Sequence, residues 1–273
     1  MNNMSDMFEM VSATDTGRVR SHNEDSIATD PDIGLATLAD GMGGYNAGEV
    51  ASGIVVAMIP AEMRKIFSTK PSGAMSGEEM QKLVAEQAGK VNAAIYNAAK
   101  TQPQYAGMGT TLVVAVWHGG NMTVGHLGDS RLYRLRGETF EQITRDHSWM
   151  QEQIESGLVT KEQARTAKNK NLVTRACGID PNVETEVHTY PVEAGDIYLL
   201  CSDGLSDMIA DDELNLTLSS LKANLPLAAD QLVQQANDNG GRDNISVILV
   251  RVLGKTQAPR ASSWLDRIKS WFK

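Results

Sequence analysis

Four aspartates share one setting, at the end of an apolar run and next to glycine, serine or asparagine. They are Asp40, Asp129, Asp203 and Asp243. Asp40 shows it most clearly, because it follows the apolar run 33–39 and opens the glycine-rich stretch DGMGG at residues 40–44. Glycine has no Cβ, so the backbone there can approach a ligand closely. One such aspartate marks a turn, but four at strand ends predict carboxylates that meet at one rim of a sheet.

Carboxylates that share a small volume repel each other unless cations are present, so this set predicts metal ions. A set of carboxylates, a backbone carbonyl and water suits Mg²⁺ or Mn²⁺, whereas the sequence has no Cys or His grouping with zinc spacing. Two ions about 3.5–4 Å apart can generate a hydroxide nucleophile and hold both oxygens of an in-line displacement at phosphorus. Arg20 is a candidate phosphate clamp beside the carboxylates Glu24 and Asp25. The predicted chemistry is phosphate ester hydrolysis.

Composition narrows the class of protein. The 273 residues suit one large domain, with 41% hydrophobic and 22% charged residues, as in globular proteins. The net charge of −9 argues against nucleic-acid binding, which needs a basic surface. No apolar run is long enough to span a bilayer, and the N-terminus lacks the layout of a signal peptide. The two cysteines form no disulfide framework, which predicts a cytoplasmic protein.

Hydrophobic periodicity predicts a protein built from antiparallel hairpins and paired helices. Strands are expected at residues 8–15, 26–29, 33–39, 110–117, 122–127, 131–136, 183–190, 197–201 and 245–250. Helices are expected from Ala47, from the capping box at 76–79, at 211–221 and at 226–239. Pro60 is expected to bend or end the first helix. His126 lies inside a strand and is interpreted as a hydrogen-bonded residue without a catalytic role.

Two segments differ in character from the rest of the chain. Residues 146–171 are polar and weakly helical, with short helices at 148–156 and 161–167, and predict a surface insert. Residues 254–263 read as a linker before an amphipathic segment, 264–273, whose apolar side chains share one helical face. That segment is expected to dock on the domain, while a partner groove and a membrane surface are alternatives.

Six stretches together resemble the bacterial branch of the metal-dependent Ser/Thr protein phosphatases, type 2C or PPM. They are TGRVRSHNED at 16–25, ADGMGG at 39–44, GTT at 109–111, GHLGDSR at 125–131, CSDGLSD at 201–207 and GRDNIS at 241–246. They follow the family's order and cover about residues 11–252. The resemblance implies an α+β fold, an αββα sandwich of two central antiparallel sheets flanked by helix pairs. It implies a phosphatase domain over 1–253, with residues 146–171 as a flap beside the site.

The resemblance also implies a role for each acidic residue in a two-ion site. Asp40 would bridge both ions, and the carbonyl of Gly41 would bind one of them. Asp203 and Asp243 would complete the coordination of the other ion, and Glu24 would act through a bound water.

Further residues are implied to support this pair of ions. Arg20 would hold the phosphoryl group, and Asp129 would share a third, weaker ion with Asp203. Asp25 would support the site from nearby. Ser202, Asn244 and Ser246 are expected to be structural rather than catalytic.

One position departs from the eukaryotic pattern. Those members carry a histidine, proposed as the acid for the leaving group, where this chain has Met42. The resemblance therefore leaves the general acid open, and our hypothesis is a metal-bound water.

The resulting expectation is a monomeric cytoplasmic enzyme that uses a metal-bound hydroxide to dephosphorylate phosphoserine and phosphothreonine in proteins, opposing a bacterial Ser/Thr kinase. The alternatives are a phosphatase of small metabolites and a pseudophosphatase that only binds phosphoproteins. The second ranks low, because the family's ligand positions are all filled.

Overall fold

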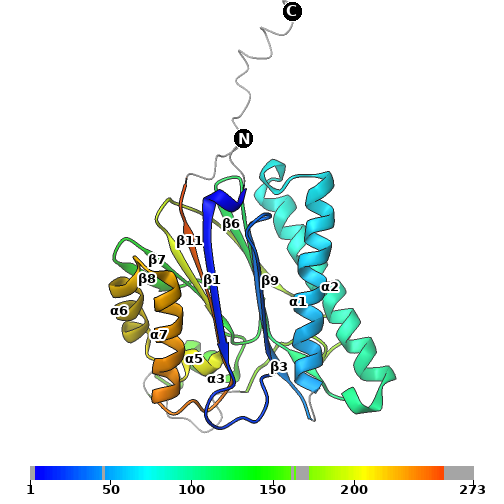
Figure 1. The fold of residues 1–273 in the computed structure, drawn as a ribbon. Helices are drawn as coiled ribbons and strands as arrows, with labels where there is room; N and C mark the ends of the chain where they lie inside the picture. The colour runs from blue at the N-terminus through cyan, green and yellow to red at the C-terminus, as the bar shows by residue number, and fades with distance from the viewer. Residues whose placement is uncertain (1–3, 45–46, 161–162, 164–171, 255–273) are drawn as a thin grey trace, which may run out of the picture.

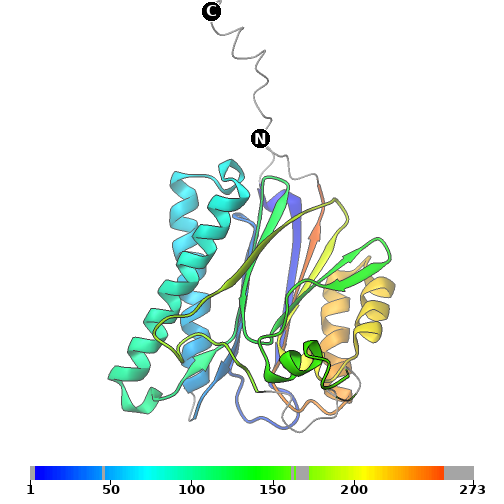
Figure 2. The same cartoon turned by 180° about the vertical axis from the view of Figure 1, so that it is seen from behind.

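The computed structural model describes residues 4–44, 47–160, 163 and 172–254. Two antiparallel sheets lie face to face, and a pair of helices covers the outer face of each sheet (Figures 1 and 2). The predicted αββα sandwich is confirmed. This layering follows from the sequence, because each sheet must bury one face against its partner and the other against helices.

One sheet has six strands, in the order β2-β3-β5-β6-β9 with β4 paired to β3. Its strands are β2 (Asp25–Asp30), β3 (Leu35–Met42), β4 (Gly109–Thr110), β5 (Leu112–His118), β6 (Asn121–Leu127) and β9 (Glu186–Pro191). Every residue of β5 is buried, as its unbroken apolar sequence predicts. The pairing of β2 with β3 sets Asp25 directly opposite Asp40.

The other sheet has five strands in the order β1-β11-β10-β7-β8. Its strands are β1 (Phe8–Asp15), β7 (Arg131–Arg136), β8 (Thr139–Gln142), β10 (Ile197–Cys201) and β11 (Ile245–Val252). The register pairs Asp15 with Ile245, so the loop after β1 lies beside the residues that precede β11. Strand β8 is not among the strands expected from the sequence.

Helices α1 (Ala47–Thr69) and α2 (Gly77–Thr101) cover the six-stranded sheet, and α6 (Asp211–Leu221) and α7 (Leu225–Asp238) cover the other (Figure 1). The shorter pieces are α3 (Trp149–Glu155), α5 (Asp203–Ser206) and the 3-10 turns η1 (Met4–Met7), η2 (Ser72–Ala74) and η3 (Pro103–Tyr105). The capping box of Ser76 with Glu79 is present as predicted.

The expected effect of Pro60 is wrong in one respect, because α1 continues through Pro60 to Thr69. Proline removes one backbone hydrogen bond from a helix. The second half of α1 buries Met63 and Phe67 against the sheet, and this apolar burial is worth more than the lost bond.

The space between the sheets is closed by apolar side chains at the end where β1 begins. Phe8, Trp117 and Tyr198 contact each other there, with ring centroids 5.8 Å apart for Phe8 and Trp117 and 5.4 Å for Trp117 and Tyr198. Packing of this kind fixes the two sheets against each other. The opposite end, where β1 and β3 finish, is where the predicted site residues lie (Figure 1).

Several predictions on the insert and the C-terminus fall outside the described residues. They are the helix at 161–167 apart from Gln163, the linker beyond Gly254, and the segment 264–273. Within the described part of the insert, the helix expected at 148–156 is present as α3, with Ser148 as its N-cap. None of the helices described here is long and apolar enough to cross a membrane.

Candidate active site

The predicted aspartates come together because four chain segments finish at the same rim. Asp40 lies near the end of β3, Asp203 opens α5 directly after β10, Asp243 precedes β11, and Asp129 lies in the turn between β6 and β7. The pKa of Asp40 is raised well above its usual range, first by burial and then by Asp25, Asp203, Asp129 and Asp243 in that order. The convergence expected from the sequence is therefore present.

The other carboxyl groups of the rim show the same perturbation. Burial is the main cause in each case: it raises the pKa of Asp203 well above its usual range, that of Asp129 to about 7 and that of Asp25 to about 6. Neighbouring carboxylates add to the effect, with Asp129 acting on Asp203. Within the described part of the chain, the rim thus gathers buried carboxyl groups that raise one another's pKa.

These residues fit hard divalent cations. Buried carboxylates that destabilise one another are the donor set that Mg²⁺ or Mn²⁺ would neutralise. One oxygen of Asp25, Oδ1, is buried without a hydrogen-bond partner among the described residues. A buried polar atom without a partner is rare in folded proteins and calls for a ligand or water.

Glu24 and Gly41 are placed by close contact with the start of α1. A Cβ on Gly41 would lie 2.2 Å from the carbonyl oxygen of Gly48, so only glycine lets β3 and α1 approach this closely. A Cβ on Gly48 would lie 2.8 Å from Oε1 of Glu24, which puts this carboxylate beside the first turn of α1. The positive end of the helix dipole favours an anion there.

Arg20 reaches the rim from the loop between β1 and β2. This loop is held against the residues before β11, because the Arg18 N–H donates to the Gly241 carbonyl at 2.7 Å. Nη2 of Arg20 donates to Oδ2 of Asp243 at 2.7 Å, while the Arg20 side chain stays 51% exposed. Arg20 is thus a half-exposed cation at the edge of the carboxylate cluster, in a position to meet an anionic substrate.

Ser202 and Asn244 hold the site segments together. The Asn244 side chain accepts from the Glu24 N–H at 2.8 Å and donates to the carbonyls of Thr16 at 3.0 Å and His22 at 2.9 Å. The Ser202 hydroxyl donates to Oδ2 of Asp25 at 2.7 Å. These contacts join loop to strand, in keeping with the structural roles expected for both residues.

Two acidic residues of the rim carry no role in the sequence analysis, Asp207 and Asp146. Asp207 raises the pKa of Asp203 and of Asp129, and Asp146 raises that of Asp129. The spacing of four between Asp203 and Asp207 on a helical turn is the signal that could have found Asp207. Asp146 was interpreted as the start of the insert.

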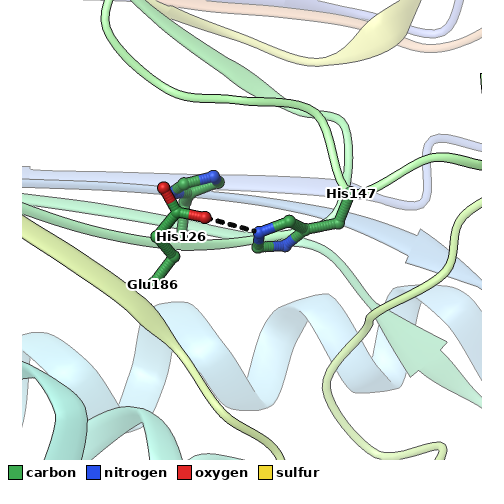
Figure 3. A group of neighbouring side chains, drawn as sticks. All are labelled: His126, His147 and Glu186. Carbon is green, nitrogen blue, oxygen red and sulfur yellow. Dashed lines mark hydrogen bonds and ion pairs between the residues drawn. The ribbon is translucent and has the colours of Figure 1, made fainter. Parts of the chain in front are cut away.

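A second group of possible metal ligands lies nearby, formed by His126, His147 and Glu186 (Figure 3). Its ligand atoms lie within 4.8 Å of one another. Nδ1 of His147 accepts from the Gly128 N–H, so Nε2 carries the proton and faces Glu186. A ligating histidine needs a free lone pair on one nitrogen and a hydrogen on the other. We therefore interpret His147 as a hydrogen-bonded residue rather than a ligand. His126 is hydrogen-bonded as expected, because its Nε2 donates to the Arg145 carbonyl, while its buried Nδ1 has no partner among the described residues.

The chain matches the model of one family, described as Protein phosphatase 2C, over residues 16–249. It is 36% identical over 240 residues to a protein of Listeria welshimeri named serine/threonine phosphatase stp, covering 87% of this chain and 93% of that protein. It is 37% identical over 250 residues to the serine/threonine protein phosphatase PstP of Mycobacterium tuberculosis, covering 89% of this chain and 46% of that longer protein.

Solved structures agree with these sequence matches. The crystal structure of Mycobacterium tuberculosis PstP superposes with a TM-score of 0.83 at 32% identity, covering 91% of this chain and 100% of that one. A structure of the PstP catalytic domain in complex with two manganese ions gives a TM-score of 0.80 at 33% identity, covering 91% of this chain and 99% of that one. Fold, site geometry and sequence thus lead to one conclusion: this chain belongs to the protein phosphatase 2C family.

Proposed function

We propose that this chain is a metal-dependent protein phosphatase that removes phosphate from serine and threonine side chains of proteins. The observation that carries the proposal is the cluster of buried, mutually repelling carboxylates at the strand ends, with Arg20 at its edge. The names of the relatives, serine/threonine phosphatases, support the same reaction. The two manganese ions bound to PstP support Mn²⁺ as the cofactor, with Mg²⁺ as the alternative.

In this proposal the strand-end residues hold two ions. Asp40, the Gly41 carbonyl, Asp203 and Asp243 would supply their ligands, and Glu24 would contribute through a bound water. When bound, these ions would supply a water nucleophile at neutral pH and neutralise the charge that develops on the phosphoryl oxygens.

Other residues of the chain position the substrate and the ligands. Arg20 has a planar fork of donors that matches two phosphoryl oxygens, and its exposed position allows it to turn from Asp243 to a substrate. Asp25 lies opposite Asp40 in the pairing of β2 with β3 and accepts from Ser202, so it links the start of β2 to the end of β10 in the other sheet. We assign Asp129 to a third, weaker ion shared with Asp203.

The residue that protonates the leaving group is not Met42, because a thioether has no proton to donate. Met42 ends β3 and pairs with Gly109 in β4, next to Asp40 and Gly41. We infer that the proton reaches the leaving serine or threonine oxygen from water at the site.

The biological setting is part of the proposal. Phosphoproteins made by a Ser/Thr kinase are the substrates, and the cytoplasm is the compartment. The free, buried thiols of Cys177 and Cys201 support a reducing compartment.

The decisive test is hydrolysis of phosphoserine and phosphothreonine peptides by the full chain, with Mn²⁺, without it, and with a chelator. Metal-dependent release of phosphate supports the proposal, and its absence with both peptides would overturn it. Comparison with small phosphorylated metabolites at equal concentration decides between a protein phosphatase and a metabolite phosphatase.

A further inference from the structure

The turn that carries Asp129 is held from the insert by His147. The backbone N–H of His147 donates to the Gly128 carbonyl at 2.8 Å. The backbone N–H of Gly128 donates in return to Nδ1 of the His147 ring at 3.3 Å. Gly128 has a φ of +99°, and a Cβ there would lie 2.6 Å from Cγ2 of Thr111. Only glycine adopts this conformation in this space, so the turn is fixed immediately before Asp129.

The same turn is connected to Asp40. The hydroxyls of Thr111 and Ser130 lie 2.7 Å apart, and Oγ1 of Thr111 accepts from the Asp40 N–H at 2.9 Å. Two hydrogen bonds thus connect the turn to the backbone of Asp40, whose carboxylate is proposed to hold the ions. A shift of this turn would therefore displace Asp40 at the centre of the site.

Glu186 determines how the His147 ring is protonated (Figure 3). Its Oε2 lies 3.2 Å from Nε2 of His147, and its Oε1 lies 2.9 Å from Nε2 of His188. An acceptor at Nε2 places the hydrogen there and leaves the Nδ1 lone pair for Gly128. The opposite tautomer would set two N–H groups against each other.

The ring of His147 is further fixed by its surroundings. The His126 ring stacks on it with centroids 4.6 Å apart, and Nε2 of His126 lies 2.8 Å from the Arg145 carbonyl oxygen. His126 and His147 are 1% and 3% exposed, and burial is the main cause that lowers the pKa of both. Two stacked neutral imidazoles avoid the repulsion that two charged rings would have.

His147 also stands where the insert leaves and rejoins the domain. The Thr174 N–H donates to the His147 carbonyl at 2.8 Å, and the Trp149 N–H donates to the Leu172 carbonyl at 2.9 Å. The base of the insert and the Asp129 turn therefore meet at this one residue.

We propose that His147, oriented by Glu186, is a positioning residue that sets the Gly128–Asp129 turn and thereby places the Asp129 carboxylate for the weaker ion. The inference rests on the ligand assignment of the proposed function. It makes His147 and Glu186 part of the site through the Gly128–Asp129 turn.

The first test measures Mn²⁺ binding to the full chain through the electron paramagnetic resonance signal of the Mn²⁺ that stays free. His147→Ala removes the acceptor for Gly128 and should weaken the weakest Mn²⁺ site about 10-fold. His147→Asn keeps an oxygen where Nδ1 lies and should restore affinity to near that of the unmodified chain. Glu186→Ala should fall between these two variants.

His118→Ala is the matched control. His118 is also buried, but its Nε2 lies 2.8 Å from Oγ1 of Thr123, away from the Asp129 turn. This variant should bind Mn²⁺ as the unmodified chain does. Equal weakening in His118→Ala and His147→Ala would show a general packing effect and overturn the proposal.

The second test is the nitrogen-15 spectrum of the His147 ring in the unmodified chain. We expect a hydrogen on Nε2 and a bare Nδ1, whereas a hydrogen on Nδ1 would overturn the proposal. The spectrum, together with His147→Asn and Glu186→Ala, decides the matter if His147→Ala does not fold.

The outcomes separate this inference from the proposed function. Mn²⁺ binding with the expected variant pattern but no phosphopeptide hydrolysis would overturn the proposed function alone. Hydrolysis with no effect of His147→Ala on any Mn²⁺ site would overturn the positioning role alone.

Discussion

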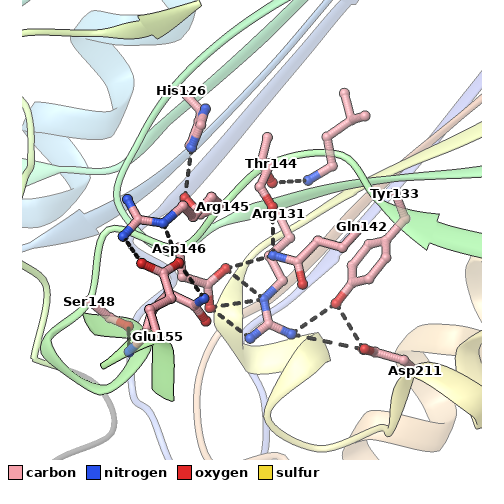
Figure 4. Close-up of polar contacts among 12 residues, drawn as sticks. His126, Arg131, Tyr133, Gln142, Thr144, Arg145, Asp146, Ser148, Glu155 and Asp211 are labelled. Atoms are coloured by element: carbon pink, nitrogen blue, oxygen red, sulfur yellow. Dashed lines mark hydrogen bonds and ion pairs between the residues drawn. The ribbon is translucent and has the colours of Figure 1, made fainter. Parts of the chain in front are cut away.

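Two clusters of buried charge lie side by side in this molecule and are built in opposite ways. In the first, around Arg131, every charge shown has a partner of the opposite kind (Figure 4). Arg131 donates to Asp146 from Nε at 2.9 Å and from Nη2 at 2.7 Å, and to the Tyr133 hydroxyl at 2.9 Å. The Tyr133 hydroxyl in turn donates to Asp211 at 3.1 Å.

In the second cluster, at the strand ends, carboxyl groups lie beside one another. Burial first, and then like charges, raise the pKa of Asp40, Asp203 and Asp129, although Arg131 acts in the opposite direction on Asp129. Arg20, which bonds Asp243, is half exposed. Among the described residues, the charges around Arg131 are paired, whereas the carboxyl groups proposed to hold the ions are buried beside one another. Buried like charges are thus a better sign of a ligand site than a buried ion pair.

The largest expected effect is a loss of activity, and it distinguishes the second cluster from the first. Asp40→Asn should lower Mn²⁺-dependent phosphopeptide hydrolysis by several orders of magnitude, because the proposed bridge between the ions is lost. Without metal its free energy of unfolding should be unchanged or higher, because a repelled charge is removed. Activity assays and denaturant unfolding in chelator check both. Retention of most of the activity would contradict the two-ion assignment.

Asp146→Asn, in the first cluster, should instead lower the free energy of unfolding. It leaves the Arg131 guanidinium without its carboxylate, so the free energy of unfolding should fall by about 3 kcal/mol. Urea unfolding with and without Mn²⁺ measures this loss. An exposed ion pair, such as Lys90 with Glu86, offers the control, since Glu86→Gln should change the free energy of unfolding little. Equal stability of Asp146→Asn and the unmodified chain would mean that the first cluster is not structural.

The pH dependence of stability should differ between metal-free and metal-loaded protein. Asp25 and Asp129 have folded pKa values of about 6 and about 7 against an ordinary value of 3.8, so the folded state binds more protons than the unfolded state between these limits. Metal-free stability should therefore fall as the pH rises through this window. The gain in melting temperature on adding Mn²⁺ should be larger at pH 8 than at pH 5. A gain that is equal at both pH values would contradict the proposal that Mn²⁺ replaces protons on these buried carboxyl groups.

A smaller effect is expected at the edge of the second cluster. Arg20→Lys keeps the charge but loses the planar fork, so KM for a phosphopeptide should rise about tenfold while stability stays unchanged. Steady-state kinetics over a range of peptide concentrations measures the change. If KM stays constant, Arg20 does not hold the phosphoryl group.

The smallest effect concerns the leaving-group proton. If water supplies this proton, Met42→His should leave the acidic limb of the pH–rate profile and the dependence on leaving group unchanged. A pronounced change in either would show that a side chain at this position can act as the acid.

Much of this was predictable from the sequence because its signals are local. The strand-end aspartates, the capping box at Ser76 and the apolar run of β5 each report on neighbours within a few residues. Six ordered motifs then identify the family and, through it, the sandwich and the proposed ligands.

Other features were decided only by the tertiary structure, because they depend on residues far apart in the sequence. Helix α1 passes Pro60 because Met63 and Phe67 find a sheet to pack against. Asp146 pairs with Arg131 across 15 positions and lies close enough to Asp129 to raise its pKa. His147 meets Gly128 and Glu186 across 19 and 39 positions, and the resulting tautomer cannot be read from any local pattern. The sequence by itself determined which groups are candidates for the chemistry, whereas the fold decided which neighbours hold them in place, because burial and hydrogen-bond geometry exist only once distant segments have packed.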